Sequence, residues 1–351
     1  MARQWLERLG TFALGAIVAV LAASAAFAQG DVCKNRGQLD TLYCDEDGDL
    51  VADVPKDPKR WRDPSTLVFA YTPVEDPAIY HNMFKPFTEY LGQCTGKRVV
   101  YYPVQSNSAE IEAMRSGRLH VGAFATGPTA FAVNLAGAVP FAAMAKDNQA
   151  TGYKLVSIVK SDSPYRKLAD LKGKRVAHTA PSSNSGHMAA LVLYPEQGLR
   201  PNEDYKPLMS GGHDKSVLGV MSGDYDMAGV ASTVFERMAV RGVTKLENFR
   251  VIYESRLFPT TSIAYAHDLK PELAKKLTDC FFAYPFTPKL IKEFNGSDRF
   301  VPISYKDHWA VVREVADKSG TPYNKAAYDK EAQREAAELS KKRPSAPQPK
   351  Q

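Results

Sequence analysis

The stretch KRVAHTAPSSNSGHMAALVLY, residues 174–194, joins two apolar runs through a polar loop. The first run predicts a strand, and the second predicts a helix over residues 186–194. Between them stand Ser182, Ser183, Asn184 and Ser185, although one such residue is enough to cap a helix N-terminus. We interpret the additional polar side chains as groups that face a bound anion.

Strands and helices alternate on both sides of this loop. The predicted strands are residues 67–71, 98–104, 119–124, 151–160, 205–208, 225–230, 250–253 and 263–267, and the predicted helices are residues 108–116, 186–194, 214–222 and 233–240, after a first helix that ends near residue 91. This alternation predicts an α/β fold with mostly parallel sheets. The order of elements indicates two α/β lobes, the second inserted into the first, joined by extended hinge segments near residues 153–160 and 251–266. Such a chain has a cleft lined by the carboxyl ends of strands and the starts of helices.

The N-terminus predicts a cleavable signal peptide over residues 1–28. Arg3 and Arg8 precede an apolar segment, and Ala26-Phe27-Ala28 fits a signal peptidase site. We therefore expect cleavage after Ala28 and a periplasmic protein. The residue directly after the cleavage site is Gln29 and not cysteine, so a lipoprotein anchor is not expected.

The rest of the chain divides by composition. We expect an irregular N-terminal extension at residues 29–64, lobe 1 at residues 65–155 and 256–325, lobe 2 at residues 156–255, and a C-terminal tail at residues 326–351 that begins as a helix. The formal net charge of +6 comes from Lys and Arg residues scattered among Asp and Glu. This pattern argues against a nucleic-acid partner. We expect a monomer.

Four cysteines, Cys33, Cys44, Cys94 and Cys280, form an even set in a chain expected to be exported. Disulfides are the default in an oxidising compartment. The sequence permits three pairings. We favour Cys33–Cys44, which closes a short N-terminal loop, together with Cys94–Cys280.

The extension contains DEDGDLVAD, residues 45–53, in which carboxylates alternate. Oxygen ligands at i, i+2 and i+4 can wrap one Ca²⁺ ion. Leu50, however, stands where calcium loops use a glycine to reach positive φ. We therefore favour a solvated acidic turn held by the Cys33–Cys44 loop, and assign no metal ligand.

Four predicted helix starts carry the same small polar residues and follow a strand or extended segment. Helix N-termini expose unpaired N–H groups and attract anions without Lys or Arg. Tyr71 ends the first predicted strand and is expected to face the cleft as well. The alternative is that each helix-start residue is an ordinary N-cap and that Tyr71 is a half-buried strand aromatic. The resulting candidate ligand residues are Tyr71, Ser106, Asn107, Thr126, Ser183, Asn184, Ser185 and His213.

Motifs of catalysis are not found. The chain has no nucleophile elbow, no zinc-protease helix and no phosphate-binding P-loop. Nothing in the spacing of Ser183, His213 and Asp226 supports a catalytic triad. We expect no enzyme activity, no catalytic residue and no cofactor.

From about residue 66 to 286, the chain resembles the phosphate/phosphite/phosphonate substrate-binding proteins of bacterial ABC importers. The matching stretches are LVFAYTPVED, EIEAMRSGRLHVGAF, LVSIVKSDSPYRKLADLKGKRVA, PSSNSG, GGHDKSVLGVMSGDYDMA and RVIYESRLFPTTS. This resemblance implies a type II periplasmic-binding-protein fold, a small oxyanion ligand and an ABC permease in the inner membrane as partner.

The resemblance also implies roles for single residues. Ser183, Asn184 and Ser185 fall on the loop that holds the phosphonyl oxygens, and His213 falls on the adjacent histidine. Members that bind aminoalkylphosphonates place two carboxylates against the ligand ammonium, and here Thr233 and Thr261 take those positions. A buried ammonium without a carboxylate is costly, so we expect phosphate, phosphite or a simple alkylphosphonate. Another small oxyanion, or a ligand-sensing role at a membrane receptor, stays open as an alternative.

Overall fold

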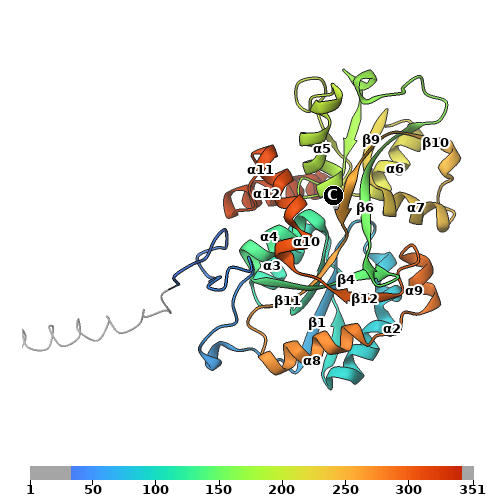
Figure 1. Cartoon of the computed structure of the whole chain (residues 1–351). Coiled ribbons are helices and arrows are strands. Elements are labelled where there is room, and N and C mark those ends of the chain that lie inside the picture. The colour runs from blue at the N-terminus through green and yellow to red at the C-terminus, as the bar shows by residue number, and fades with distance from the viewer. Residues whose placement is uncertain (1–32, 342–351) are drawn as a thin grey trace, which may run out of the picture. The chain divides into compact units, whose positions relative to one another are not determined.

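The computed structural model describes residues 33–341. The predicted signal peptide and residues 342–351 of the predicted tail lie outside the described residues. Between residues 35 and 341 the chain forms two sheets, each flanked by helices (Figure 1).

The first sheet has seven strands and the second has five. The first runs in the order β12-β4-β11-β3-β1-β2, with β5 beside β4, and the second in the order β10-β6-β9-β7-β8. The strands are β1 (Thr66–Tyr71), β2 (Arg98–Tyr101), β3 (Val121–Phe124), β4 (Ala138–Lys146), β5 (Gln149–Ala150), β6 (Gly152–Lys160), β7 (Val176–His178), β8 (Leu208–Met209), β9 (Met227–Ala231), β10 (Phe249–Pro259), β11 (Ser262–Ala266) and β12 (Arg299–Pro302).

Helices cover both sheets. They are α2 (Ala78–Thr95), α3 (Asn107–Arg115), α4 (Thr126–Ala136), α5 (Ala189–Leu193), α6 (His213–Ser222), α7 (Ser232–Val240), α8 (Pro271–Phe282), α9 (Pro288–Glu293), α10 (Tyr305–His308), α11 (Ala310–Ser319) and α12 (Lys325–Lys341). A wide π-helical turn, η3 (Asn184–Met188), leads directly into α5.

The chain leaves the first sheet after β5 and returns to it with β11. We call the body around the first sheet lobe 1 and the body around the second sheet lobe 2. Each lobe has its own apolar core, with Phe69, Phe84 and Phe131 among the buried side chains of lobe 1, and Leu155 and Val217 among those of lobe 2. The expected α/β architecture with two lobes is confirmed.

The expectation of mostly parallel sheets is wrong. β1 pairs in parallel with β2 and β3, and β7 pairs in parallel with β8 and β9. The segments that pass between the lobes enter the sheets in the opposite direction, so β6 pairs antiparallel with β9 and β10, and β11 with β3 and β4. Both sheets are therefore mixed.

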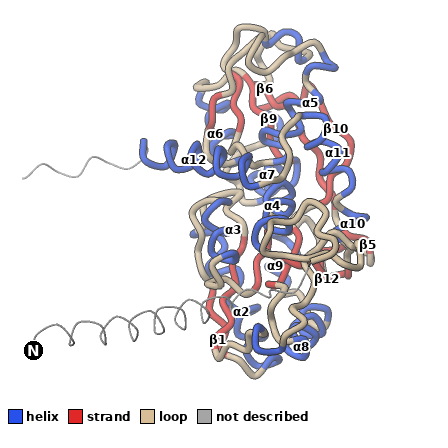
Figure 2. Tube along the Cα trace, turned by 90° about the vertical axis from the view of Figure 1, so that its left-hand side faces the viewer, coloured by secondary structure: helices blue, strands red, loops and turns tan. Residues whose placement is uncertain are grey.

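The last helices lie at the junction of the lobes (Figure 2). α11 packs against α4 of lobe 1 and α5 of lobe 2, and α12 packs against α3. Asn134 anchors the segment before α12, because its side-chain Nδ2 donates to the Tyr323 carbonyl at 2.8 Å. The C-terminal tail was expected to begin as a helix, and in the structure this helix, α12, extends to Lys341.

The disulfide pairing favoured from the sequence is confirmed. Cys94 of α2 is bonded to Cys280 of α8, which fastens two helices of lobe 1. Cys33 and Cys44 are also disulfide-bonded, and the described chain has no free cysteine.

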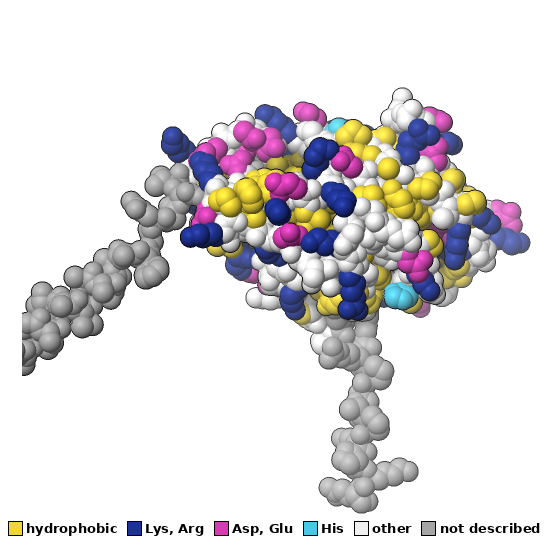
Figure 3. Space-filling view, turned by 90° about the horizontal axis from the view of Figure 1, so that it is seen from below, with side chains coloured by type: hydrophobic (Ala, Val, Ile, Leu, Met, Phe, Trp, Pro, Cys, Tyr) yellow, Lys and Arg dark blue, Asp and Glu magenta, His cyan; other side chains and the backbone are white. Residues whose placement is uncertain are grey.

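The surface seen in Figure 3 carries Lys and Arg side chains interspersed with Asp and Glu, in agreement with the charge pattern of the sequence. Among residues 33–341, no helix combines the length and apolar character needed to cross a membrane.

Candidate functional site

A cavity of about 600 Å³ lies between the lobes. Its lining includes the first residues of α4 from lobe 1 and of η3, α6 and α7 from lobe 2. Unpaired N–H groups at helix starts carry partial positive charge. Their convergence makes the cavity suited to a small anion.

Most of the candidate ligand residues meet in this cavity. Tyr71, Asn107, Thr126, Ser183, Asn184, Ser185 and His213 all line it. Ser106 is not among the lining residues. It is the N-cap of α3, where its hydroxyl accepts a hydrogen bond from the Ala109 N–H at 3.1 Å, and the site described below does not include it.

The loop before α5 is held in place by its own N-cap and by a close backbone approach. Ser183 Oγ accepts a hydrogen bond from the Gly186 N–H at 3.1 Å, so its hydroxyl hydrogen remains available to a ligand. A Cβ on Gly186 would lie 1.8 Å from Thr179 Oγ1, so only glycine fits at this position. The glycine thus allows the loop to pack against the end of β7.

Two buried polar atoms next to this loop have no hydrogen-bond partner among the described residues. They are Thr179 Oγ1 and Asn184 Oδ1, and both residues line the cavity. Unpaired buried polar groups are uncommon because each costs about 1–3 kcal/mol. An oxyanion oxygen in the cavity would accept from the Thr179 hydroxyl, and a protonated ligand oxygen or a water would donate to Asn184 Oδ1, which can only accept.

His213 is a neutral donor. Its Nδ1 accepts a hydrogen bond from the Ala231 N–H at 3.1 Å, so the ring hydrogen is on Nε2. Burial lowers the pKa of His213 to about 4, although the Glu75 carboxylate opposes this shift. At neutral pH the residue can donate one hydrogen bond but carries no charge.

Two tyrosines provide further neutral hydroxyls. Burial raises the pKa of Tyr71 and of Tyr153, so both phenols keep their hydrogens at physiological pH. Asn184 Nδ2 donates to the Tyr153 oxygen at 3.1 Å. This bond orients the Tyr153 hydroxyl beside the loop.

The lobes touch directly beside the cavity, through Asn107, which lines it. Asn107 of lobe 1 accepts a hydrogen bond from Thr72 Oγ1 and donates from Nδ2 to Ser182 Oγ of lobe 2 at 3.0 Å. The carboxylate of Glu335, on α12, accepts from Ser182 Oγ and from the Ser108 N–H, both at 3.1 Å. Asn107 and Glu335 therefore hold the lobes against each other.

Basic side chains near the cavity are already paired. The buried Arg237 guanidinium lies 2.7 Å from the Glu75 carboxylate, and Arg241 contacts the same carboxylate. Lys154 pairs with Glu254 at 2.7 Å where both side chains are half-exposed. The cavity's capacity for an anion therefore comes from dipoles and hydroxyls.

Tyr153 and Thr179 also line the cavity, although they were not predicted from the sequence. Thr179 directly follows β7, and polar residues at the carboxyl ends of strands are typical of ligand sites in α/β folds. Tyr153 gave no comparable signal, because it lies within the apolar pattern of β6.

The family model for "ABC transporter, phosphonate, periplasmic substrate-binding protein" matches residues 69–309. The chain belongs to this family. Its members are transport proteins of the periplasm, which serve ABC transporters as substrate-binding components. The resemblance drawn from the sequence motifs is confirmed.

Individual members of the family are similar over most of their length. The phosphate-import protein PhnD of Mycolicibacterium smegmatis is 27% identical over 62% of this chain and 71% of its own. The phosphonates-binding periplasmic protein of Escherichia coli is 26% identical over 71% of this chain and 72% of its own.

Solved structures share the fold. The binding protein of a phosphonate ABC transporter from Pseudomonas aeruginosa superposes with a TM-score of 0.66 at 21% identity, over 80% of this chain and 97% of the other. PhnD1 from Prochlorococcus marinus, in complex with methylphosphonate, also superposes with a TM-score of 0.66, at 18% identity, over 74% of this chain and 99% of the other. The type II periplasmic-binding-protein fold is confirmed.

Proposed function

We propose that this family member binds a small phosphorus oxyanion, namely phosphate, phosphite or a simple alkylphosphonate, in the interlobe cavity and delivers it to an ABC permease. The single observation that carries this proposal is the convergence of four helix starts and several buried neutral donors on one cavity. The names of the curated relatives, one for phosphate and one for phosphonates, support the same ligand class.

In the proposed complex, Ser183, Asn184 and Ser185 hold the oxyanion oxygens together with Thr179. His213 donates from Nε2, and Tyr71 and Thr126 complete the site from lobe 1. Thr126 Oγ1 donates to the Pro259 carbonyl at 2.8 Å, so it contributes by accepting from a protonated ligand oxygen or through its backbone. The proposal includes no covalent step.

The proposed ligand has no ammonium group. Thr233 and Thr261 line the cavity, and neither can neutralise a cation. The carboxylates of Glu236 and Glu254 also line it, but both residues are exposed and already bonded, to Asn295 and Lys154. A buried ammonium without a carboxylate costs several kcal/mol.

Calorimetric titration of the purified protein with phosphate, phosphite, methylphosphonate and 2-aminoethylphosphonate tests the proposal. We expect binding of at least one of the first three, and weaker binding of the amino compound. A clear preference for 2-aminoethylphosphonate would contradict the assignment of Thr233 and Thr261. The absence of binding by all four would contradict the ligand class.

Export and assembly are part of the same proposal. The apolar N-terminal segment supports a signal peptide that is cleaved after Ala28, and the protein is proposed to act as a monomer. N-terminal sequencing of protein from the periplasmic fraction should begin at Gln29, and light scattering should give the mass of one chain.

A further inference from the structure

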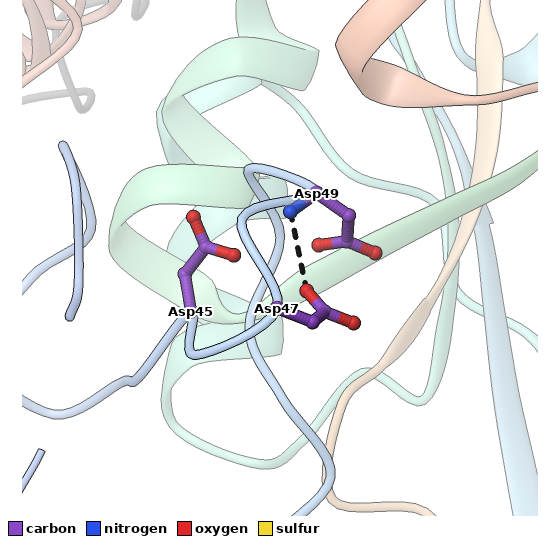
Figure 4. A group of neighbouring side chains, drawn as sticks. All are labelled: Asp45, Asp47 and Asp49. Atoms are coloured by element: carbon purple, nitrogen blue, oxygen red, sulfur yellow. Dashed lines mark hydrogen bonds between the residues drawn. The ribbon is translucent and has the colours of Figure 1, made fainter. Parts of the chain in front are cut away.

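The acidic loop at residues 45–53 brings three carboxylates together on lobe 1. One oxygen from each of Asp45, Asp47 and Asp49 lies within 4.8 Å of the others. Figure 4 shows Asp47 and Asp49 side by side, with Asp45 across the loop from them, and the Asp49 N–H donates to Asp47 Oδ1 at 3.1 Å.

Asp45 is the unusual member of this group. It is 1% exposed, and its buried Oδ1 accepts no hydrogen bond from any described residue. The Asp45 N–H donates to the Asn35 carbonyl at 2.9 Å, which fixes the backbone at this point. A buried carboxylate oxygen without a partner costs free energy unless a cation or a donor meets it.

Basic side chains near the loop are directed to other atoms. Lys306 donates to the Gly48 carbonyl at 2.9 Å, and Lys56 pairs with Glu46 at 2.6 Å. Within residues 33–341, no Lys or Arg forms a salt bridge with Asp45, Asp47 or Asp49. No basic side chain of the described residues therefore forms an ion pair with these three carboxylates.

The neighbouring carboxylates are bonded to the backbone of the same loop. Asp49 Oδ1 accepts from the Val51 N–H at 3.0 Å, and Asp53 Oδ2 accepts from the Glu46 N–H at 2.8 Å. A cation among the carboxylates of the loop would offset their mutual repulsion.

The sequence argument against a metal ion, which was based on Leu50, does not hold in the structure. Leu50 was expected to prevent the positive φ that a calcium loop needs, but Leu50 has φ 72° and Gly48 has φ 73°. Leu50 packs on the core of lobe 1, and this contact helps to maintain the unfavourable conformation.

We propose that Asp45, Asp47 and Asp49 bind one Ca²⁺ ion. Calcium takes oxygen ligands at about 2.3–2.6 Å, so ligands on opposite sides of the ion are about 5 Å apart. The 4.8 Å limit on the separation of these oxygens is compatible with one ion. Backbone carbonyls and water would complete its coordination of six to eight oxygens.

The proposed ion has a structural role at the outer side of lobe 1. The segment before the loop is bonded to the C-terminal end of α4, through the Asp40 N–H to the Asn134 carbonyl and the Tyr43 hydroxyl to the Leu135 carbonyl. The other end of α4 lines the cavity. We expect calcium to stabilise the extension on lobe 1 and to leave oxyanion affinity unchanged.

The test uses the purified protein after treatment with EDTA, titrated with CaCl₂ and followed by calorimetry and thermal unfolding. We expect one site per chain and a rise in melting temperature at calcium concentrations up to about 10 mM, since extracellular calcium modules bind at about 10⁻⁴–10⁻³ M. Asp47→Asn and Asp49→Asn should each weaken calcium binding about tenfold or more, because each removes a charged ligand. Both residues are exposed, so these variants should fold.

Glu46→Gln is the matched control. It removes the same charge from the same loop, but the Glu46 side chain pairs with Lys56 and does not belong to the cluster. The control should bind calcium like the wild type. An equal loss of calcium affinity in the Glu46 variant would show that the effect is general charge attraction, and it would overturn the proposal. A wild-type protein that does not respond to calcium would overturn it as well. An equal response to MgCl₂ would overturn the assignment to calcium.

Discussion

At the scale of single residues, the proposed site offers neutral donors. His213 shows why this is possible, because its Nδ1 is occupied by a backbone N–H and its Nε2–H remains as the donor. Burial keeps its pKa at about 4. A neutral donor stabilises an anion without the desolvation cost that a buried charged histidine would carry.

This protonation state predicts a pH dependence of stability. Above pH 6.5, residue 213 is neutral in both the folded and the unfolded chain, so pH has no effect through it. As the pH is lowered from 6.5 to about 4, only the unfolded chain takes up the proton. The free energy of unfolding therefore falls by about 1.4 kcal/mol for each pH unit of acidification through this residue. We therefore expect plots of the free energy of unfolding against pH, measured with urea for wild type and His213→Asn, to differ in slope by the equivalent of one proton over this range. Equal slopes would show that His213 is not held neutral.

Residues that line the cavity could be predicted where the signal was local. Ser183, Asn184 and Ser185 are recognisable because four polar residues stand where one would serve as a cap. Ser106 has the same appearance, but in the structure it caps α3 and is not among the residues that line the cavity. Tyr153 reaches the cavity because of the way β6 crosses between the lobes, which is a tertiary property that no local pattern reports.

At the scale of secondary structure, the elements with clear periodicity could be predicted, and β4 could not. Its sequence AVPFAAMAK is rich in alanine and contains Pro140, which disfavours a strand. The segment is nevertheless a strand because it lies between β11 and β12 in the sheet of lobe 1. Tertiary pairing overrides local propensity there.

The contact between Glu75 and α7 predicts a large effect of one substitution. Glu75 follows β1 in lobe 1, its side chain is fully buried, and it pairs with Arg237 and Arg241 of lobe 2. Burial raises the pKa of Glu75, but the guanidinium groups of Arg237 and Arg241 lower it by more than burial raises it. The pKa of Glu75 therefore lies below its usual value. Glu75→Gln leaves Arg237 buried without its carboxylate, so we expect a loss of about 3–5 kcal/mol in the free energy of unfolding.

Chemical denaturation measures this loss, and Glu254→Gln provides the control. Glu254 pairs with Lys154 where both side chains are half-exposed, and such pairs contribute less than about 1 kcal/mol. If the two variants lose the same stability, Glu75 is not a structural link between the lobes.

At the scale of the whole molecule, the two lobes approach each other at the backbone. Gly127 lies in the first turn of α4 in lobe 1, and a Cβ at this position would lie 2.2 Å from the Ser182 carbonyl oxygen in lobe 2. Because the obstructing atom belongs to the backbone, a side chain cannot simply rotate away. The arrangement of the lobes in this structure therefore requires glycine at residue 127.

Gly127→Ala should keep the lobes apart. We expect oxyanion binding to weaken by about 1–3 kcal/mol or more, as for other overpacking substitutions, and small-angle scattering at saturating ligand to show a larger radius of gyration. Gly92→Ala, in α2 and away from the cavity, is the control. Unchanged affinity and scattering in the Gly127 variant would mean that ligand binding does not need this approach.

The central claim is that helix starts and neutral hydroxyls bind the anion, without a basic side chain. Calorimetric dissociation constants for phosphate and methylphosphonate, measured on wild type, Ser183→Ala and Lys154→Gln, test it most directly. The account predicts that Ser183→Ala weakens binding of the preferred ligand by about 1–3 kcal/mol, because a charged acceptor loses a donor, and that Lys154→Gln changes it by less than about 1 kcal/mol, as expected for an exposed charge. A large loss with Lys154→Gln and none with Ser183→Ala would contradict the claim.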